Sequence, residues 1–335
     1  MKKIIIIGGG AMGSAFTIPC LENNNKVTIT EPYSKRFIKD LSSKDKFHSA
    51  LKVKLPKNLK FRKFSKELLK EKFDLIVIAL SLSGIDFIGK ELENLQNKVP
   101  ILVLTKGLKY EKKGKKILTI SEQLKNNYNI SNISILKGPC LAKELARKSQ
   151  TSVIVASKSI KKAKQIGKII STNYYSTEIS TDLTGVELSG AIKNIYSMLI
   201  GASEGLSNSK ASKEIQSKYF LNTAASLIHR SISEMVEFVS HYGGKPETVY
   251  GLAGLGDLYV SAIGGRNSLM GKYLGEGYLY NEAKEKFMKN ITIEGAQLAL
   301  EIGPKILQDL NPKHFPLMFS VLQTICENKK LKISW

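Results

Sequence analysis

Short runs of hydrophobic residues alternate with amphipathic segments through the first half of the chain. Uninterrupted apolar runs, such as residues 4–7 and 75–80, are typical of strands that are buried on both faces of a parallel sheet. Between these runs, apolar positions recur at helical spacing. The alternation predicts an α/β domain built on a doubly wound sheet. We expect strands at residues 3–7, 26–30, 74–80, 101–105, 133–136 and 152–156, and helices at 12–22, 85–95 and 161–170.

The pattern changes at two places along the chain. A Pro-Lys-Asn sequence at 56–58 interrupts the strand-like segment 51–64, which predicts a hairpin inserted in the sheet. From about Thr181 the strand pattern disappears and helical periodicity takes over. We therefore expect two domains, a dinucleotide-binding α/β domain at 1–180 and an all-helical substrate-binding domain at 181–335. The expected helices of the second domain cover residues 185–201, 218–243, 269–284 and 292–302.

The first expected strand leads into a glycine-rich turn and then a helix. Its sequence, Gly8-Gly9-Gly10-Ala11-Met12-Gly13, is a G-x-G-x-x-G pattern in the context of a Rossmann-type sheet. Gly8 permits the tight turn, Gly10 lets a pyrophosphate approach the backbone, and Gly13 lets the helix pack on the strand. The N–H groups at the start of the helix can bind the phosphates. The expected cofactor-binding residues here are Gly8, Gly10, Ala11, Met12 and Gly13.

An acidic residue follows at the end of the second expected strand. Glu31 stands about 20 residues after the glycines, where an acid accepts hydrogen bonds from the adenosine ribose and favours NAD. Lys35 and Arg36 follow closely and can instead hold the 2′-phosphate of NADP. We expect NAD as the cofactor, with Glu31 binding it, and NADP stays open as the alternative.

The chain as a whole is strongly basic. Lys and Arg number 51 against 29 Asp and Glu, which gives a formal net charge of +22, but only five of the basic residues are arginine. Nucleic-acid readers depend on arginine for base contacts and stacking, and the lysines here are scattered. We interpret the charge as a bias in composition and expect no nucleic acid as a partner. A basic protein that binds nucleic acid or an anionic membrane surface is the alternative from another class.

The cysteine spacing and the hydropathy argue against a disulfide-stabilised, a metal-binding and a membrane-spanning protein. Cys20, Cys140 and Cys326 lie too far apart in the sequence for a disulfide framework or a C-x-x-C metal site, which favours a reducing cytoplasm and no metal. No apolar run approaches the roughly 20 residues of a membrane-spanning helix, so we expect no membrane insertion. The four histidines lie outside every motif, and we assign them no catalytic role.

Four further motifs follow the glycine loop in order. Together with it, they resemble the bacterial NAD(P)-dependent glycerol-3-phosphate dehydrogenases over nearly the whole chain. The adjacent Lys193-Asn194 pair and the G-L-A-G-L-G-D sequence are the most specific features. The rival family, the β-hydroxyacid and 6-phosphogluconate dehydrogenases, uses Lys-x-x-x-Asn instead. The motifs are T-K-G-L at 105–108, G-P-C-L-A-K-E-L-A at 138–146, G-V-E-L-S-G-A-I-K-N at 185–194 and G-L-A-G-L-G-D-L at 251–258, followed by G-R-N at 265–267.

The resemblance implies that the chain interconverts dihydroxyacetone phosphate and sn-glycerol 3-phosphate with NAD(P)(H), supplies phospholipid synthesis and forms a homodimer. It implies that Lys193 is the general acid/base and that Lys106 polarises the reacting oxygen. We expect desolvation and the nearby cation of Lys106 to lower the pKa of Lys193. The implied substrate-binding residues are Lys106, Gly138, Cys140, Asp257, Gly265, Arg266 and Asn267. The implied cofactor contacts beyond the first loop are Lys106, Ala142, Arg266 and Glu294.

The chain departs from the family pattern at three places. Cys140 and Gly265 stand where the family commonly has serine, which puts the contacts of those hydroxyls in doubt. Residues 207–219 are longer and richer in lysine than the family pattern, and we expect a surface insertion that leaves the site intact.

Overall fold

The computed structural model of the chain describes residues 1–93, 99–210 and 221–334. The chain divides into two compact units, one of Met1–Lys106 with Ile120–Leu183 and one of Gly107–Thr119 with Thr184–Trp335. The main division therefore falls three residues after the expected boundary. The short segment 107–119 groups with the second unit, which nothing in the sequence pattern indicates.

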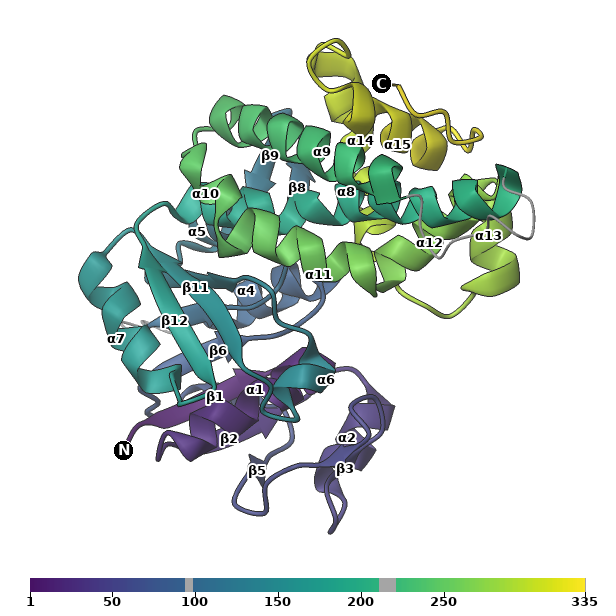
Figure 1. Ribbon diagram of the computed structural model, residues 1–335. Coiled ribbons are helices and arrows are strands. Elements are labelled where there is room, and N and C mark those ends of the chain that lie inside the picture. The colour runs from purple at the N-terminus through teal and green to yellow at the C-terminus, as the bar shows by residue number, and fades with distance from the viewer. Residues whose placement is uncertain (94–98, 211–220, 335) are drawn as a thin grey trace. The chain divides into compact units, whose positions relative to one another are not determined.

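In the described part of the first unit, eight strands form one sheet (Figure 1). Neighbouring strands run parallel, except that β10 and β11 are antiparallel. The strand order reverses between β1 and β6, which is the point where such sheets bind ligands. This arrangement confirms the predicted doubly wound sheet. In spatial order the strands are β12 (Tyr175–Ser180), β11 (Thr151–Ser157), β10 (Ile133–Lys137), β7 (Ile101–Val103), β6 (Leu75–Ile78), β1 (Lys3–Ile7), β2 (Lys26–Thr30) and β5 (Lys60–Phe61).

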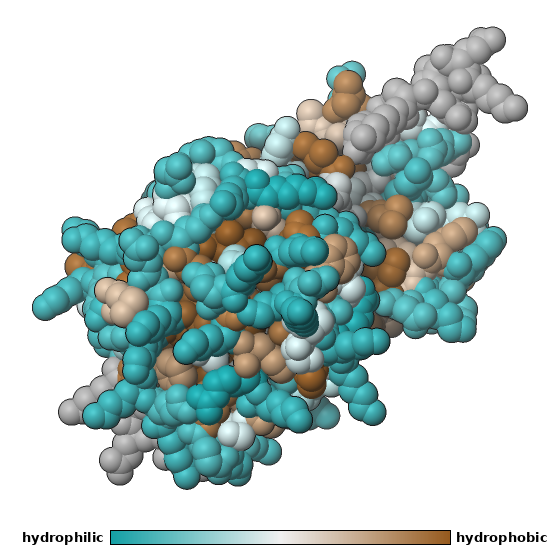
Figure 2. Space-filling model, turned by 90° about the horizontal axis from the view of Figure 1, so that it is seen from below, coloured by the Kyte–Doolittle hydropathy of each residue, from teal (hydrophilic) through white to brown (hydrophobic). Residues whose placement is uncertain are grey.

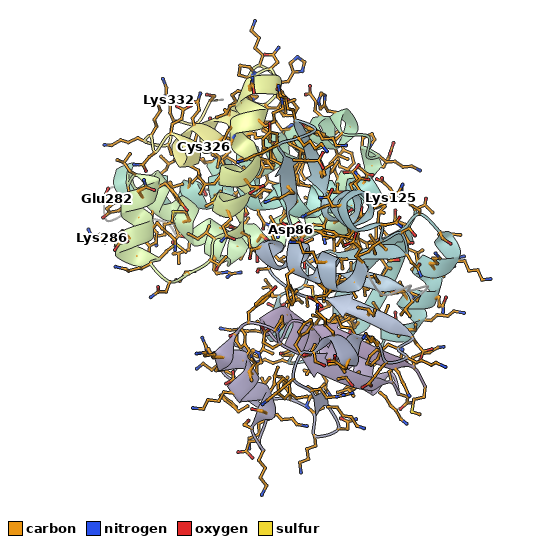
Figure 3. The ribbon with its side chains drawn as sticks, turned by 180° about the vertical axis from the view of Figure 1, so that it is seen from behind. Asp86, Lys125, Glu282, Lys286, Cys326 and Lys332 are labelled. Atoms are coloured by element: carbon orange, nitrogen blue, oxygen red, sulfur yellow. The ribbon has the colours of Figure 1, made fainter. Side chains whose placement is uncertain are left out.

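Helices cover both faces of this sheet, which explains the unbroken apolar runs of its central strands. The four isoleucines of β1, at 4–7, are all fully buried. Helices α1 (Ala11–Glu22) and α7 (Ile160–Ile170) lie on one face, and α4 (Ile85–Glu93) and α5 (Ile120–Tyr128) lie on the other (Figure 1). Asp86 of α4, labelled in Figure 3, accepts hydrogen bonds from Gln123 and Tyr128, which ties α4 to α5. Shorter elements of this unit are α2 (Lys35–Ser42), β3 (Phe47–His48), β4 (Val53–Lys54), α3 (Lys66–Leu69), η1 (Leu82–Gly84) and α6 (Ala142–Leu145).

The predicted hairpin at 51–64 is wrong. The antiparallel pair is β3 with β4, so the hairpin spans 47–54. The chain turns at 56–58 as expected, but the next strand, β5, pairs in parallel with β2 instead of folding back. The end of the helix expected at 85–95 lies outside the described residues.

In its described residues, the second unit is helical apart from one hairpin and the loops between elements. The hairpin of β8 (Leu108–Glu111) and β9 (Lys116–Thr119) packs against α14 (Glu294–Asp309). The other elements are α8 (Leu183–Lys210), α9 (Leu221–His241), α10 (Glu247–Tyr250), η2 (Leu252–Gly256), α11 (Asp257–Ile263), α12 (Arg266–Gly275), α13 (Tyr280–Phe287) and α15 (Pro316–Cys326). Near the end of α15, Cys326 donates to the carbonyl of Ala299 on α14 (Figure 3).

Helix α8 is the centre of this unit, since nearly every described side chain between Val186 and Ser203 is buried. Glycines of both helices set how closely α12 crosses it, as Gly271 and Gly201 show. A Cβ at Gly271 would lie 1.7 Å from the carbonyl oxygen of Met198, and one at Gly201 would lie 2.3 Å from that of Ser268. The close crossing brings the start of α12 beside the middle of α8.

One helix prediction of the second half is wrong, and another can be compared with the structure only in part. The segment 269–284 is not one helix, because α12 ends at Gly275 and α13 begins at Tyr280. Gly277 lies between them with φ of +98°, which ends helical geometry there. Most of the expected insertion at 207–219, and the start of the helix expected at 218–243, lie outside the described residues.

The surface carries much of the chain's charge. Figure 2 shows hydrophilic side chains over most of one face, with apolar surface recessed between them. Within the described ranges, no helix combines the length and the apolar character that crossing a membrane requires.

Candidate active site

The glycine loop of the first unit has the geometry that a dinucleotide requires. Gly8 has φ of +118°, and a Cβ at Gly13 would lie 2.0 Å from the carbonyl oxygen of Gly8. Side chains at either place would strain or break the turn between β1 and α1. At Gly10, by contrast, a Cβ would meet only the Phe37 ring, at 3.9 Å. The backbone at the start of α1 is thus open to close approach, so the loop fits the pyrophosphate of NAD(P).

The middle residue of the loop is held from both sides. The Gly9 N–H donates to Glu31 Oε2 at 2.6 Å, and its carbonyl oxygen lies 3.0 Å from His48 Nε2. Because the Leu51 N–H donates to Nδ1 of His48, the proton of the neutral ring is on Nε2 and is donated to Gly9. His48 is fully buried. This contact was not predicted from the sequence, because nothing along the chain links His48 to the loop.

The T-K-G segment follows β7, at the carboxyl edge of the sheet. Thr105 donates from Oγ1 to the Leu80 carbonyl at 2.8 Å, and the buried ammonium of Lys137 donates to the Thr105 carbonyl at 2.8 Å. Lys106 comes next and is partly exposed. Lys137 was also missed, although a lysine that ends an apolar strand directly before Gly-Pro is a signal that sequence reasoning can use.

The G-P loop follows the neighbouring strand, β10. Gly138 has φ of +127°, and a Cβ there would lie 3.1 Å from the Cα of Val153. Cys140 and Ala142 are partly exposed. Complete burial raises the pKa of Tyr175 well above its ordinary value, and the nearby thiol of Cys140 adds to this shift.

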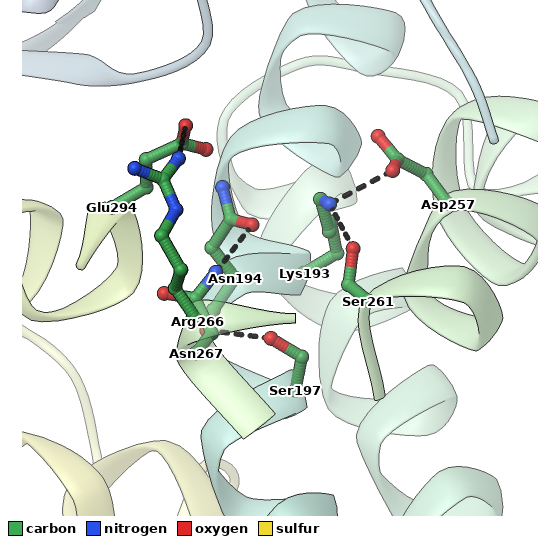
Figure 4. Close-up of polar contacts among 8 residues, drawn as sticks. All are labelled: Lys193, Asn194, Ser197, Asp257, Ser261, Arg266, Asn267 and Glu294. Carbon is green, nitrogen blue, oxygen red and sulfur yellow. Dashed lines mark hydrogen bonds and ion pairs between the residues drawn. The ribbon is translucent and has the colours of Figure 1, made fainter. Parts of the chain in front are cut away.

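In the second unit, Lys193 of α8 points toward α11 (Figure 4). Its Nζ donates to Asp257 Oδ1 at 2.8 Å and also to Ser261 Oγ. Lys193 is 3% exposed and Asp257 is 2% exposed. Asp257 and Ser261 are four residues apart, so one face of α11 presents both oxygens to the lysine. Sequence reasoning missed Ser261, which this spacing from Asp257 indicates.

A second group of side chains joins α8 to the starts of α12 and α14 (Figure 4). Asn267 donates from Nδ2 to Asn194 Oδ1 at 2.9 Å and accepts the Gly295 N–H at 2.9 Å. Beside it, Arg266 Nη2 lies 3.0 Å from Glu294 Oε1, and both of these side chains are about half exposed. Gly265 is the residue that caps the start of α12.

The structure therefore assembles the predicted residues of the second unit into two groups, which meet at the adjacent residues Lys193 and Asn194 of α8. Glycines 8, 10 and 13 with Ala11, Met12 and Glu31 form the loop region of the first unit. Lys106, Gly138, Cys140 and Ala142 follow β7 and β10, which are adjacent parallel strands of the same sheet. The sequence predicts that Asp257 binds the substrate hydroxyl or orients Lys193, and Asp257 does bind the Lys193 ammonium directly. A carboxylate at this distance stabilises the protonated ammonium.

Comparison with known proteins gives a consistent result along the whole chain. The model of the N-terminal part of the NAD-dependent glycerol-3-phosphate dehydrogenases matches residues 3–163, and that of the C-terminal part matches residues 182–334. An NADP(+)-dependent glycerol-3-phosphate dehydrogenase of Archaeoglobus fulgidus is 31% identical, over 98% of this chain and 96% of that one. A glycerol-3-phosphate dehydrogenase (NAD(P)+) of Clostridium botulinum is 32% identical, over 89% of this chain and 85% of that one.

Solved structures agree with this result. The glycerol-3-phosphate dehydrogenase of Coxiella burnetii superposes with a TM-score of 0.81 at 27% identity, covering 98% of this chain and 96% of that one. A D-mandelate dehydrogenase shares the fold alone, with a TM-score of 0.57 at 14% identity, over 98% of this chain and all of that one. The rival dehydrogenase family named above is not favoured. The chain belongs to the NAD-dependent glycerol-3-phosphate dehydrogenase family and is an NAD(P)-dependent oxidoreductase.

Proposed function

We propose that the chain reduces dihydroxyacetone phosphate to sn-glycerol 3-phosphate, and catalyses the reverse reaction, with Lys193 as the general acid/base. The observation that carries the proposal is the buried arrangement of Lys193, Asp257 and Ser261. A lysine is rarely buried unless it is paired, and here it lies in the helix that carries the Lys-Asn motif. Such a group suits proton transfer in a site from which water is excluded.

Reduction of a ketone requires a hydride at carbon and a proton at oxygen. NAD(P)H, when bound, supplies the hydride. Lys193 holds the proton on Nζ and delivers it to the carbonyl oxygen, while Asp257 stabilises the ammonium and Ser261 orients it. In the oxidative direction the same amine accepts the proton of the substrate hydroxyl. Lys106, at the carboxyl edge of the sheet, polarises the reacting oxygen.

The phosphate of the substrate requires a fixed cation, and Arg266 is suited to this task. A guanidinium presents a planar fork of donors that matches phosphate oxygens. The Arg266 side chain is half exposed, and its ion pair with Glu294 holds the guanidinium beside the start of α14. Asn267 uses one amide proton on Asn194, and we assign its second proton to the phosphate. Gly265 places the backbone at the cap of α12, in place of the serine common in the family.

The remaining roles follow from the positions of the loops. Gly138 and Cys140 line the substrate side of the G-P loop, and Ala142 contacts the cofactor. A thiol is a weaker hydrogen-bond donor than a hydroxyl, so the contact of Cys140 is weaker than that of the usual serine. The glycine loop with Glu31, together with Lys106, Arg266 and Glu294, completes the proposed cofactor site.

The cellular setting is also proposed from the family resemblance. We assign the chain to the cytoplasm, where three free cysteines are compatible with a reducing environment. We propose a homodimer that supplies glycerol 3-phosphate to phospholipid synthesis.

A direct assay tests this function. The purified chain is mixed with NADPH or NADH and dihydroxyacetone phosphate, and oxidation of the nicotinamide is followed by absorbance. We expect turnover that depends on Lys193. Failure here combined with turnover of 6-phosphogluconate or a β-hydroxyacid would assign the chain to the rival chemistry. Salt-sensitive binding to duplex DNA or anionic vesicles, with no turnover of any of these substrates, would favour the basic binding protein instead.

A further inference from the structure

A lysine that the proposed mechanism does not use is buried at the carboxyl edge of the sheet. Lys137 is the last residue of β10, a strand in which every residue is buried, and is only 2% exposed. A charged side chain is seldom buried so deeply, because polar partners must replace the water that it loses. The G-P motif begins at the next residue, Gly138, so no motif accounts for Lys137.

The ammonium of Lys137 binds the segment that follows the neighbouring strand. Its Nζ donates to the carbonyl oxygen of Thr105 at 2.8 Å. The parallel pairing of β7 with β10 ends at Val103 and Ile135, so Thr105 lies beyond the ladder of the sheet. A buried backbone carbonyl at such a place needs another donor, and the lysine supplies it. A hydrogen bond from a charged donor is about twice as strong as one between neutral groups, so this contact holds Thr105 firmly.

Thr105 is also held from the opposite side. Its Oγ1 donates to the carbonyl of Leu80, just after β6, at 2.8 Å. The N–H of the preceding residue, Leu104, donates to the Ile78 carbonyl of β6 at 2.9 Å. Because β7 lies between β6 and β10, these contacts come from both of its neighbours. A peptide group is planar, so fixing the Thr105 carbonyl also fixes the N–H and the Cα of Lys106.

Lys106 is the residue that we propose to polarise the reacting oxygen, and its partly exposed side chain can reach a substrate. A misplacement of about 1 Å at a catalytic group can cost about 10²-fold in rate, so the anchor of Lys106 matters. We propose that Lys137 is a positioning residue for this reaction. Its ammonium fixes the Thr105–Lys106 peptide, and thereby the point from which Lys106 reaches the substrate oxygen, without touching the substrate itself. The inference rests on the dehydrogenase function proposed above.

A double-mutant cycle on kcat tests this role. Lys137→Met keeps the length of the side chain and removes the donor, and it should lower kcat by about 10- to 100-fold. The KM values for dihydroxyacetone phosphate and the nicotinamide cofactor should stay within about three-fold, because Arg266 and the glycine loop are unchanged. In a Lys106→Met background, the same substitution should change kcat by less than about three-fold, since no ammonium is left to position. A purely structural loss would instead be the same in both backgrounds.

Two further variants serve as controls. Lys284→Met removes another ammonium that donates to backbone carbonyls, those of Met288, Lys289 and Ile291 in the second unit. Its kcat should stay within about two-fold of the wild-type value, because those carbonyls lie outside the proposed site. Lys137→Arg keeps a cationic N–H donor at the buried position and should recover most of the kcat that Lys137→Met loses.

Hydrogen exchange separates this inference from the proposed reaction, because it needs no turnover. Mass spectrometry of a peptide that spans residues 104–108 should show exchange about five-fold faster or more in Lys137→Met than in the wild type and in Lys284→Met. A wild type without turnover that shows this difference would contradict the proposed function and support the placement of Lys106 by Lys137. Unchanged exchange of the peptide, or an equal loss of kcat in both backgrounds, would overturn the inference.

Discussion

Lys193 and Asp257 form a buried ion pair in which Nζ and Oδ1 lie 2.8 Å apart and both side chains are almost completely shielded from solvent. The two residues come from different helices and are 64 positions apart in the sequence. Because a buried charge is tolerated only with a partner, each residue fixes the charge state of the other.

Replacement of the lysine tests its proposed role in proton transfer. Lys193→Ala should lower kcat by about 10²- to 10⁴-fold, because the carbonyl oxygen loses its proton donor. Lys272→Ala is a matched control, since it breaks another ion pair of the second unit, with Glu204 on α8 at 2.9 Å, outside the site. Steady-state kinetics of the wild type and of both variants measure these values of kcat. A kcat of Lys193→Ala near that of the wild type would refute the assignment.

Ser261 is proposed to orient the lysine without touching the substrate. Ser261→Ala should lower kcat by about ten-fold or more, because the Lys193 ammonium loses a charge-assisted hydrogen bond. The melting temperature and the KM for dihydroxyacetone phosphate should change little. Ser261→Thr, which keeps the hydroxyl, should recover most of kcat and restore the wild-type pH profile. Equal losses in the two variants would instead indicate a packing role for Ser261.

Much of the fold was predictable because its central strands are buried on both faces. The four isoleucines of β1 and the apolar run of β6 are typical of buried parallel strands, so their composition alone predicts these strands. Strand β12 was missed, since it is half exposed and mixes polar with apolar residues. The β8–β9 hairpin was missed for a different reason: it is stabilised by packing on α14, almost two hundred residues away in sequence.

The site residues were predictable where a motif carries them, and their partners were not. Lys193, Asp257 and Arg266 stand in motifs, whereas Ser261 and His48 act through contacts that only the folded chain creates. The linear pattern also gives no sign of which groups Glu31 accepts from. Its role depends on backbone N–H groups whose direction is decided by the turn after β2.

Arg266 should affect substrate binding far more than stability. Its ion pair with Glu294 is half exposed, so its contribution to folding is about 1 kcal/mol or less. Arg266→Ala should raise KM for dihydroxyacetone phosphate by about 10- to 100-fold, because a charge-assisted phosphate contact is lost. Lys289→Ala breaks another exposed ion pair of the second unit, with Glu285 and outside the proposed site, so it is the control for the substrate effect. An unchanged KM in Arg266→Ala would argue against the phosphate role.

The crossing of α8 and α12 leaves no space for a side chain at Gly271. A methyl group there would lie 1.7 Å from the Met198 carbonyl oxygen, so the helices must separate. We expect Gly271→Ala to lower the free energy of unfolding by about 1–3 kcal/mol and to reduce kcat as well, because α12 carries Arg266. Gly264→Ala is the control, since a Cβ at Gly264 meets no atom within 4 Å. Urea unfolding and kinetics of both variants provide the comparison, and equal stability of the two would contradict the packing argument.

A buried carboxylate in the second unit should make stability depend on pH. Glu234 accepts the backbone N–H groups of Leu317 and Met318 at the start of α15, and the hydroxyl of Tyr196. Burial nevertheless dominates and raises the pKa of Glu234 from 4.5 to about 7. The folded chain therefore binds more protons than the unfolded chain between these values. Its free energy of unfolding should fall as the pH rises through this window.

The variant Glu234→Gln isolates that contribution, because it keeps the shape but cannot titrate. The stability of the wild type relative to Glu234→Gln should be greatest below about pH 4.5 and should decline by up to about 3 kcal/mol as the pH approaches 7 and above. Other carboxylates titrate in both proteins and cancel in this difference. Glu282→Gln, at an exposed position of α13, should leave the pH profile unchanged (Figure 3). Urea unfolding from pH 5 to 8 measures the difference, and a constant or rising value would show that the hydrogen bonds at α15 outweigh the cost of burying the charge.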